Sequence, residues 1–334
     1  AQIVPLTSFE NAIFAVTVVN LLLFAAMPVL AFRISRPKVG MTAFLLLSVP
    51  LFAFTYPFLI PLEENQPQIL VSFLVLFAVE RSRNGGPILG GVAMALAASI
   101  KLYPAIFALF WLFGGDRRAF GAFALAGAAL GAASVAIAGW PMHEAFLSEI
   151  KAISNSALYS TANYSLDPFI AKLALSDDLM RITTEETGGE TIWKVVEKTQ
   201  AWRLANMALF AGAVTFLAWQ AARGKARHAY FWPAAFLLLA LVSPLTWLYH
   251  LIPALVFLPA LMFTALPLLP SLVLYVSFIF LMRANGAFSD LGLSLALPGT
   301  HELIFFTLLL LAGAYLLLTS ERADRPLNPP AQSL

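Results

Sequence analysis

The sequence predicts an all-α polytopic membrane protein, with about nine spanning helices and one broken re-entrant hairpin. Three observations support this fold class. Of the 334 residues, 60% are hydrophobic and only 11% are charged, and the mean hydropathy is +0.83. Apolar runs of about 20 residues, the length that crosses a bilayer, recur along the chain. The basic residues gather in alternate short loops. Because soluble domains carry about 25% charged residues, this composition excludes a water-soluble enzyme and a nucleic-acid binder.

Each apolar run is expected to be helical, because an open sheet would leave backbone groups unpaired in lipid. The predicted spans cover residues 12–32, 41–62, 68–80, 119–139, 203–222, 230–247, 250–266, 269–282 and 302–319. The stretch 87–113 is flanked on both sides by basic loops of one set, so we expect it to enter and leave on the same side. Its two legs would meet at Lys101 and Pro104, at the tip of a broken hairpin.

The basic residues predict the orientation of the chain. Twelve of the 20 lysines and arginines lie in one set of short loops, and the opposite short loops hold none. By the positive-inside rule the basic set is cytoplasmic. The set comprises Arg33, Arg36, Lys38, Arg81, Arg83, Arg117, Arg118, Arg223, Lys225, Arg227, Arg322 and Arg325. We therefore expect residues 1–334 to form a single transmembrane domain with a long external segment over residues 140–200.

Two parts of this external segment have the spacing of amphipathic helices that lie on the membrane surface. The apolar positions are Met142, Phe146, Leu147, Ile150 and Ile153 in the first, and Ile192, Val195, Val196, Thr199 and Trp202 in the second. Between them, Asp167 precedes a proline. We expect Asp167 to cap a helix rather than to act as a base.

Two cations in predicted membrane segments need a reason, because a charge in mid-membrane costs about 2.5–3.5 kcal/mol on insertion scales. Lys101 is a candidate to bind a phosphate or a developing anion; alternatively its amine reaches the external interface. Arg283 ends a span on the external side. Its guanidinium fits a lipid phosphate, or it pairs with Asp290 or Glu302.

Two external turns carry the other candidate residues. The turn 63–68 holds two acids and three amides, so Asn65 and Gln66 either bind sugar hydroxyls or belong to a solvated turn. The turn 243–250 carries Trp247, Tyr249 and His250. The two aromatic rings suit a sugar-stacking platform or an aromatic belt, and the imidazole can bind phosphate or move a proton. No grouping in the sequence has metal-ligand spacing, so no metal is expected.

These motifs occur in a characteristic order. The residues are Asn65 and Gln66, then Lys101 and Pro104, then Asn163, Ser165 and Leu166, and finally Ser243, Pro244, Trp247 and His250. In order, spacing and sidedness the chain resembles the bacterial C-type glycosyltransferases from about residue 10 to about residue 320. Within them it is most similar to the branch that contains the mycobacterial phosphatidylinositol-mannoside mannosyltransferases.

The resemblance implies a multi-pass transferase of the bacterial cytoplasmic (inner) membrane, with its site and the long loop on the external, periplasmic side. It implies transfer of a hexose or pentose from a polyprenyl-phosphate donor to a lipid or glycan, with no cofactor besides this co-substrate. Lys101, His250 and Arg283 would bind the donor phosphate, and Asn65, Gln66, Trp247, Tyr249 and Asn163 would contact the sugar or the acceptor. In the family, an acidic residue in a first external loop activates the acceptor. This chain has no counterpart, so we expect the catalytic base in a missing N-terminal region.

Two other functions remain open from the sequence. The chain would serve as a non-catalytic scaffold subunit of a membrane protein complex if the acidic loop is truly lost. A transporter or flippase is the third hypothesis, although no internal repeat is present. The expected partners are membrane lipids, the polyprenyl-phosphate sugar, and a membrane protein complex or N-terminal fragment; nucleic acid is not expected.

Overall fold

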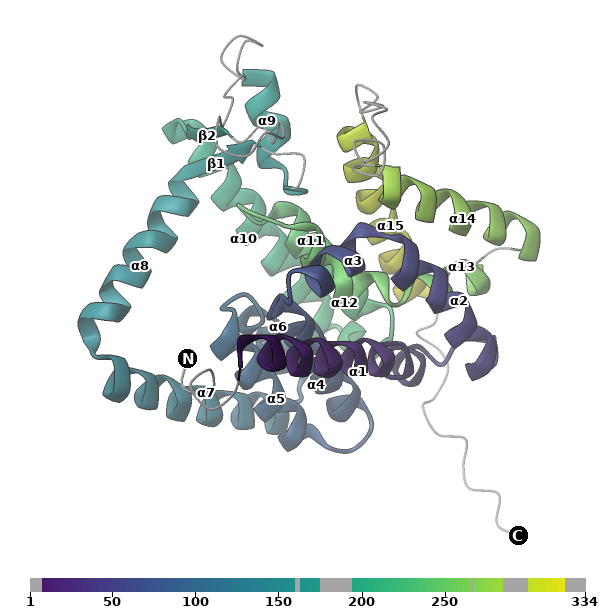
Figure 1. Ribbon diagram of the computed structural model, residues 1–334, viewed down its shortest axis with the longest axis horizontal. Helices are drawn as coiled ribbons and strands as arrows, with labels where there is room; N and C mark the ends of the chain where they lie inside the picture. Colours follow the sequence, from purple (N-terminus) through teal and green to yellow (C-terminus); the bar gives the residue numbers. More distant parts are fainter. Residues whose placement is uncertain (1–7, 160–162, 175–193, 266, 285–299, 322–334) are drawn as a thin grey trace.

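The computed structural model describes residues 8–159, 163–174, 194–265, 267–284 and 300–321, and nearly all of them are helical (Figure 1). The predicted all-α architecture is therefore confirmed. The helices are α1 Phe9–Ser35, α2 Met41–Phe54, α3 Tyr56–Glu63, α4 Gln68–Arg83, α5 Pro87–Ile100, α6 Ala105–Gly114, α7 Arg117–Ala138, α8 Trp140–Asn155, α9 Asp167–Ala174, α10 Gln200–Ala222, η3 Lys225–Arg227, α11 Phe231–Val242, η4 Leu248–Leu251, α12 Ile252–Leu255, α13 Leu258–Ala265, α14 Leu268–Ala284 and α15 Thr300–Glu321. Two short strands are β1 Ser156–Tyr159 and β2 Lys194–Glu197.

Among the described residues, three helices are long and apolar enough to cross a membrane, namely α1, α7 and α10. A fourth span results if α2 and α3, which are bent by 63° at their junction, are counted together. The apolar helices α5, α6, α11 and α14 and the apolar stretch Leu303–Thr319 of α15 are shorter. The expected nine spans are thus not confirmed. The break predicted within residues 87–113 is confirmed, because α5 ends at Ile100 and α6 begins at Ala105.

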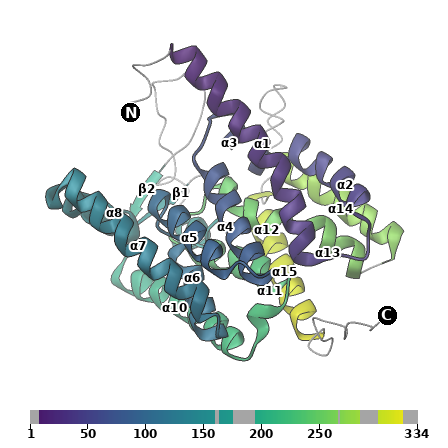
Figure 2. The same cartoon turned by 90° about the horizontal axis from the view of Figure 1, so that it is seen from below.

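The outer helices expose large apolar side chains. Phe14 on α1, Leu125 on α7 and Ile137 on α7 are 71%, 76% and 87% exposed. The peripheral helix α8 buries none of its residues (Figures 1 and 2). Apolar surface of this extent is ordinary against lipid and unfavourable against water. These faces support a multi-pass membrane protein.

The core lies around α11, which is apolar on every side and is buried almost all round, as its composition predicts (Figure 1). Phe231, Trp232 and Phe236 form edge-to-face or tilted ring contacts with the aromatic side chains of α6, including Phe107 and Phe110. The chain then continues through η4 and α12, whose residues are also mostly buried. This packing holds the turn before η4 against the rest of the bundle.

Two adjacent glycines let α5 pack closely against α4 on one side and α7 on the other. A Cβ atom added at Gly90 would lie 2.7 Å from the carbonyl oxygen of Ala78 on α4. One added at Gly91 would lie 2.7 Å from the backbone nitrogen of Phe123 and 2.8 Å from the Cβ of Ala122, both on α7. Small residues allow such backbone approach between membrane helices. The packing holds the first turns of α5 against both neighbours.

The sequence predicted two amphipathic helices around residues 140–200, and the structure contains one of them. The first expected amphipathic helix is present as α8, with Met142 65% exposed. The second is wrong, because Val195 and Val196 lie in β2, which pairs antiparallel with β1; Ile192 lies outside the described residues. β-branched residues favour a strand. Alternate side chains then face opposite sides, with Val196 packed towards Trp202 and Val195 exposed.

We predict that Gly91→Ala lowers the unfolding midpoint of the detergent-solubilised protein, because the new methyl group overlaps the backbone of α7 at a cost of about 1–3 kcal/mol. Gly127→Ala is the matched control. Gly127 lies on α7, the helix that Gly91 packs against, and a Cβ atom added there would have no atom within 4 Å. Alanine favours a helix over glycine by about 1 kcal/mol, so this variant should not lose stability. Equal midpoints for the two variants would contradict the close α5–α7 packing.

Candidate functional site

Two turns bring together side chains that are 149 residues apart in the sequence. Lys101 follows α5, and His250 lies in the short helix η4. The Lys101 Nζ atom lies 3.4 Å from His250 Nε2, and 4.9 Å from the centre of the Tyr249 ring, over its face. Three residues that the sequence singled out separately thus meet. We call Lys101, Tyr249 and His250 the lysine–histidine cluster.

The hydrogen bonds of His250 determine which nitrogen carries the proton. The backbone N–H of Trp247 donates to His250 Nδ1 at 3.1 Å, so a neutral imidazole is protonated at Nε2. A charged Lys101 offers only N–H donors as well. Two donors that face each other are left unsatisfied unless a shared acceptor lies beside them. An oxyanion such as phosphate is such an acceptor, and no carboxylate among the described residues forms an ion pair with Lys101.

A buried amide adds an unused acceptor next to the cluster. Gln68, at the start of α4, donates from Nε2 to the Tyr103 hydroxyl at 2.7 Å and to Ser72 Oγ at 3.0 Å. The Tyr103 ring in turn meets the His250 ring edge-on, with 5.5 Å between the centres. Gln68 Oε1 is buried and has no hydrogen-bond partner. The sequence prediction missed Gln68, although it is the third amide of the turn 63–68.

The other two amides of that turn are engaged elsewhere. Asn65 has left-handed backbone geometry, with φ of 49°. Its Oδ1 accepts hydrogen bonds from Thr17 Oγ1 and Asn20 Nδ2, each at 3.1 Å, which ties α1 to the turn. Gln66 Nε2 donates to Glu64 Oε2 at 2.8 Å. Within the described residues no hydrogen bond joins Asn65 or Gln66 to the lysine–histidine cluster, so sugar binding by either stays a prediction.

A carboxylate of the same turn acts on the cluster through its charge. The short helix α3, which ends at Glu63, packs against η4. Burial raises the pKa of Tyr249, and the negative charge of Glu64 raises it further. Glu64 and its neighbour Glu63 are both exposed. The structure therefore offers one carboxylate within electrostatic reach of the cluster.

Asn163 attaches the external segment to the turn that carries the cluster. Its Oδ1 accepts the backbone N–H groups of Ser165 and Thr246, each at 3.1 Å, and its Nδ2 donates to a backbone carbonyl at 2.9 Å. Asn163 also forms an isolated β-bridge with Trp247. The Trp247 ring stacks on Tyr249, 6.4 Å between centres. The described contacts of Asn163 hold Trp247 in place, and direct contact of Asn163 with a sugar stays a prediction.

Arg283 lies apart from the lysine–histidine cluster in the described contacts. Its guanidinium sits over the ring of Tyr56, 4.7 Å from the ring centre, where α14 packs against α3. Tyr56 is the first residue of α3, so Arg283 lies about 10 Å along that helix from the turn at Glu63. Asp290 and the side chain of Glu302, the alternative partners of Arg283, lie outside the description. A role of Arg283 in phosphate binding stays a prediction.

An apolar cavity of about 90 Å³ borders the cluster. Its walls include Tyr103, Phe107, Phe236, Thr246, His250 and Pro253. His250 is the residue of the cluster that lines this cavity. In the part of the chain that the structure describes, no three histidine or carboxylate side chains are grouped to hold a metal ion.

Asp167 has a different role from the expected one. It is the first residue of α9 and is 1% exposed. Its carboxylate accepts from Trp202 Nε1 at 2.9 Å and forms an ion pair with Lys198 at 2.5 Å. The expectation that this side chain caps α9 is therefore wrong. The buried Lys198 amine needs a counter-charge, and Asp167 supplies it.

Comparison with known proteins identifies the family. The profile of glycosyltransferase family 87 matches residues 2–245, which include Lys101 and Asn163 and stop before His250. No curated protein and no solved structure matches the chain. The match covers more than half of the 334 residues and agrees with the apolar, multi-helical architecture. This chain therefore belongs to glycosyltransferase family 87 and is a membrane glycosyltransferase.

Proposed function

We propose that this protein transfers a hexose or pentose from a polyprenyl-phosphate donor to a lipid or glycan acceptor, at the external face of a bacterial cytoplasmic membrane. The observation that carries the proposal is the convergence of Lys101 Nζ and the protonated Nε2 of His250, 3.4 Å apart, beside an apolar cavity. Together with the resemblance in the sequence, this favours the branch of the mycobacterial phosphatidylinositol-mannoside mannosyltransferases.

The cluster suits the leaving group of such a reaction. The acceptor oxygen forms a bond to the anomeric carbon while the bond between that carbon and the phosphate oxygen breaks, and the electron pair stays on the phosphate. Negative charge therefore grows on the phosphate as the reaction proceeds. Fixed donors that face this charge stabilise the transition state more than the ground state. Lys101 and His250 fill that role, and the apolar cavity receives the first part of the polyprenyl chain.

The aromatic rings and amides beside the cluster suit the sugar. Trp247 and Tyr249 present stacked rings next to the proposed phosphate position. Gln68 Oε1 is free to accept a hydrogen bond from a hydroxyl group. Asn65, Gln66 and Asn163 support these elements through the hydrogen bonds that hold the turns.

The acceptor hydroxyl needs a base for its proton. Among the described residues, Glu64 is the carboxylate whose charge reaches the cluster, through Tyr249. We therefore assign Glu64 as the candidate that receives the proton within this chain.

The external placement rests on the charge distribution. Arg33, Arg36, Arg83 and Arg227 gather at the opposite ends of α4 and α5 from the cluster. The positive-inside rule makes that end cytoplasmic. The lysine–histidine cluster is then on the external side, where lipid-linked sugars are used by the enzymes that this chain resembles.

The first prediction concerns phosphate binding by the cluster. Lys101→Ala and His250→Ala should each weaken binding of a short-chain polyprenyl phosphate by at least about tenfold, because each removes a hydrogen bond to a charged group worth about 1.5–3 kcal/mol. Polyprenyl phosphate is the product that the proposed reaction releases from the donor, whichever sugar the donor carries. Binding is measured by titration of the detergent-solubilised protein. Lys38→Ala, an exposed lysine in the loop after α1, is the control. Wild-type affinity for polyprenyl phosphate in both cluster variants would contradict a role of the cluster in donor binding.

The second prediction separates the two neighbouring glutamates. Glu64→Gln should lower the turnover number for transfer by at least about tenfold, the lower range of general-base contributions, and leave polyprenyl-phosphate affinity nearly unchanged. Glu63→Gln should retain turnover. The assay offers a panel of polyprenyl-phosphate hexoses and pentoses to proteoliposomes. Full turnover in Glu64→Gln would overturn the assignment of Glu64 as the base.

The same assay tests the scaffold hypothesis. A folded wild-type protein that transfers no sugar from the panel, and that co-purifies with stoichiometric partners, would support a non-catalytic scaffold and overturn the enzyme proposal. Accumulation of intact donor inside the proteoliposomes would instead support a flippase.

A further inference from the structure

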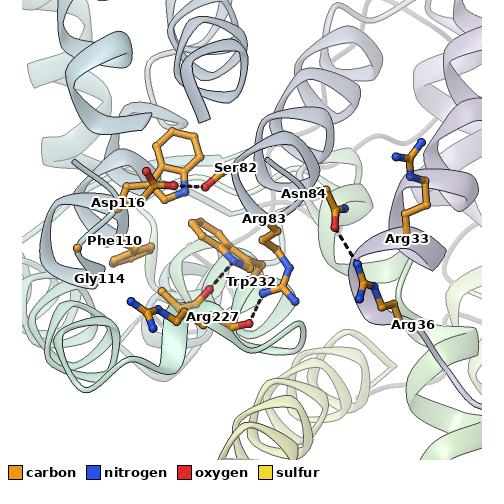
Figure 3. Close-up of a pocket in the computed structure, with 13 residues that line it drawn as sticks. Arg33, Arg36, Ser82, Arg83, Asn84, Phe110, Gly114, Asp116, Arg227 and Trp232 are labelled. Atoms are coloured by element: carbon orange, nitrogen blue, oxygen red, sulfur yellow. Dashed lines mark hydrogen bonds between the residues drawn. The ribbon is translucent and has the colours of Figure 1, made fainter. Parts of the chain in front are cut away.

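A second polar site lies at the other ends of α4 and α5. It is a cavity of about 400 Å³, larger than the one at the lysine–histidine cluster (Figure 3). Residues far apart in the sequence line it: Arg33 and Arg36 from the end of α1, Arg83 and Asn84 from the end of α4, and Arg227 from η3. The 14 residues of α5 put about 21 Å between this cavity and Lys101. It is a separate site, which we call the arginine pocket.

Two of its arginines, Arg36 and Arg83, donate to neutral partners. Arg36 Nη2 donates to Asn84 Oδ1 at 2.9 Å (Figure 3). Arg83 Nη1 donates to the backbone carbonyl of Arg227. Among the described residues, none of Arg36, Arg83 and Arg227 forms an ion pair with a carboxylate. Three arginines thus line one cavity without an ion-pair partner among the described residues.

The nearby carboxylates already have partners. Glu80 is buried and pairs with Arg33 at 2.8 Å and with Arg81 at 2.5 Å. Asp116, which lines the cavity, accepts from Ser82 Oγ at 2.5 Å and from a backbone N–H at the start of α7. Burial and the neighbouring Arg36 lower the pKa of Arg83 to about 10, as expected where positive charge is in excess.

The rest of the wall is aromatic. Phe110, Trp111 and Trp232 line the cavity beside the arginines. Trp232 Nε1 donates to the carbonyl of Ala226 at 3.0 Å, whereas Trp111 Nε1 is buried without a hydrogen-bond partner. The site therefore combines arginine donors, one unused indole donor and flat apolar surface. Its volume falls within the range of small-molecule sites, about 300–1,000 Å³, and exceeds what a lone phosphate ion needs.

We propose that the arginine pocket binds a phosphate ester, with the phosphate held by Arg36 and Arg83 and the esterified group against Trp232 and Trp111. A guanidinium group can bind two phosphate oxygens at once, so Arg36 and Arg83 can hold one phosphate group between them. The ester is either the head group of an anionic lipid from the adjacent leaflet or a soluble phosphate ester. This site is independent of the proposed transferase chemistry.

The test compares two sources of the same chemistry. The purified full chain is titrated with glycerol 3-phosphate in a neutral detergent, and in parallel it is reconstituted in phosphatidylcholine vesicles with or without phosphatidylglycerol. A ligand that binds only the folded protein raises its unfolding midpoint. Stabilisation by glycerol 3-phosphate identifies a soluble ester, and stabilisation by phosphatidylglycerol alone identifies a lipid head group. No stabilisation in either arm overturns the proposal.

Variants assign the binding to the pocket. Arg36→Gln and Arg83→Gln should weaken it by at least about tenfold, the loss of one charged hydrogen bond. Arg118→Gln removes the same charge from an exposed position outside the cavity and should bind like the wild type. Arg36 is exposed, so its variant carries the test if Arg83→Gln fails to fold. Lys101→Ala should retain the binding, because the lysine–histidine cluster is a separate site. Equal loss in Arg118→Gln, or complete loss in Lys101→Ala, contradicts the assignment.

Discussion

The fold depends on the close approach of α5 to α4 and α7 at Gly90 and Gly91. In lipid, helices gain little from burying apolar side chains against each other, so association relies on contact between backbones and small residues. Here that contact anchors a helix of 14 residues that has a polar site at each end. Lys101 follows its last residue, and the arginine pocket lies beside the turn before its first. A shift of α5 would therefore disturb both sites together.

The two sites solve the same electrostatic problem differently. At the lysine–histidine cluster, the proton position forced on His250 by the Trp247 N–H leaves two donors facing one another. At the arginine pocket, the neighbouring acids are already occupied by other partners. In both places cations lack a carboxylate partner among the described residues. A cation that is left unpaired in a low-dielectric environment is costly. We therefore expect an anionic ligand at each of the two sites.

The sequence allowed prediction of features that depend on local chemistry. The basic loops on both sides of residues 87–113 predicted the break between α5 and α6, and the apolar spacing at Met142 predicted α8. Features that depend on distant partners were not accessible. Val195 had helical spacing, but pairing with β1 decided its conformation. Asp167 had the sequence context of a helix cap, but its carboxylate forms an ion pair with the buried Lys198 instead. In the sequence Gln68 is one of several polar residues of a turn, and its contact with the distant Tyr103 could not be predicted.

The number of arginines in the loops predicts which side of the membrane they occupy, but it does not predict the arginine pocket. The positive-inside rule requires only that arginines lie in loops on one side, and any exposed position satisfies it. It does not require that arginines from α1, α4 and η3 face a common cavity, nor that Arg83 donate to a backbone carbonyl rather than to water. Like charges held together repel, so this convergence is unfavourable unless something compensates it. Topology explains which side these arginines occupy. Ligand binding explains why they share one pocket.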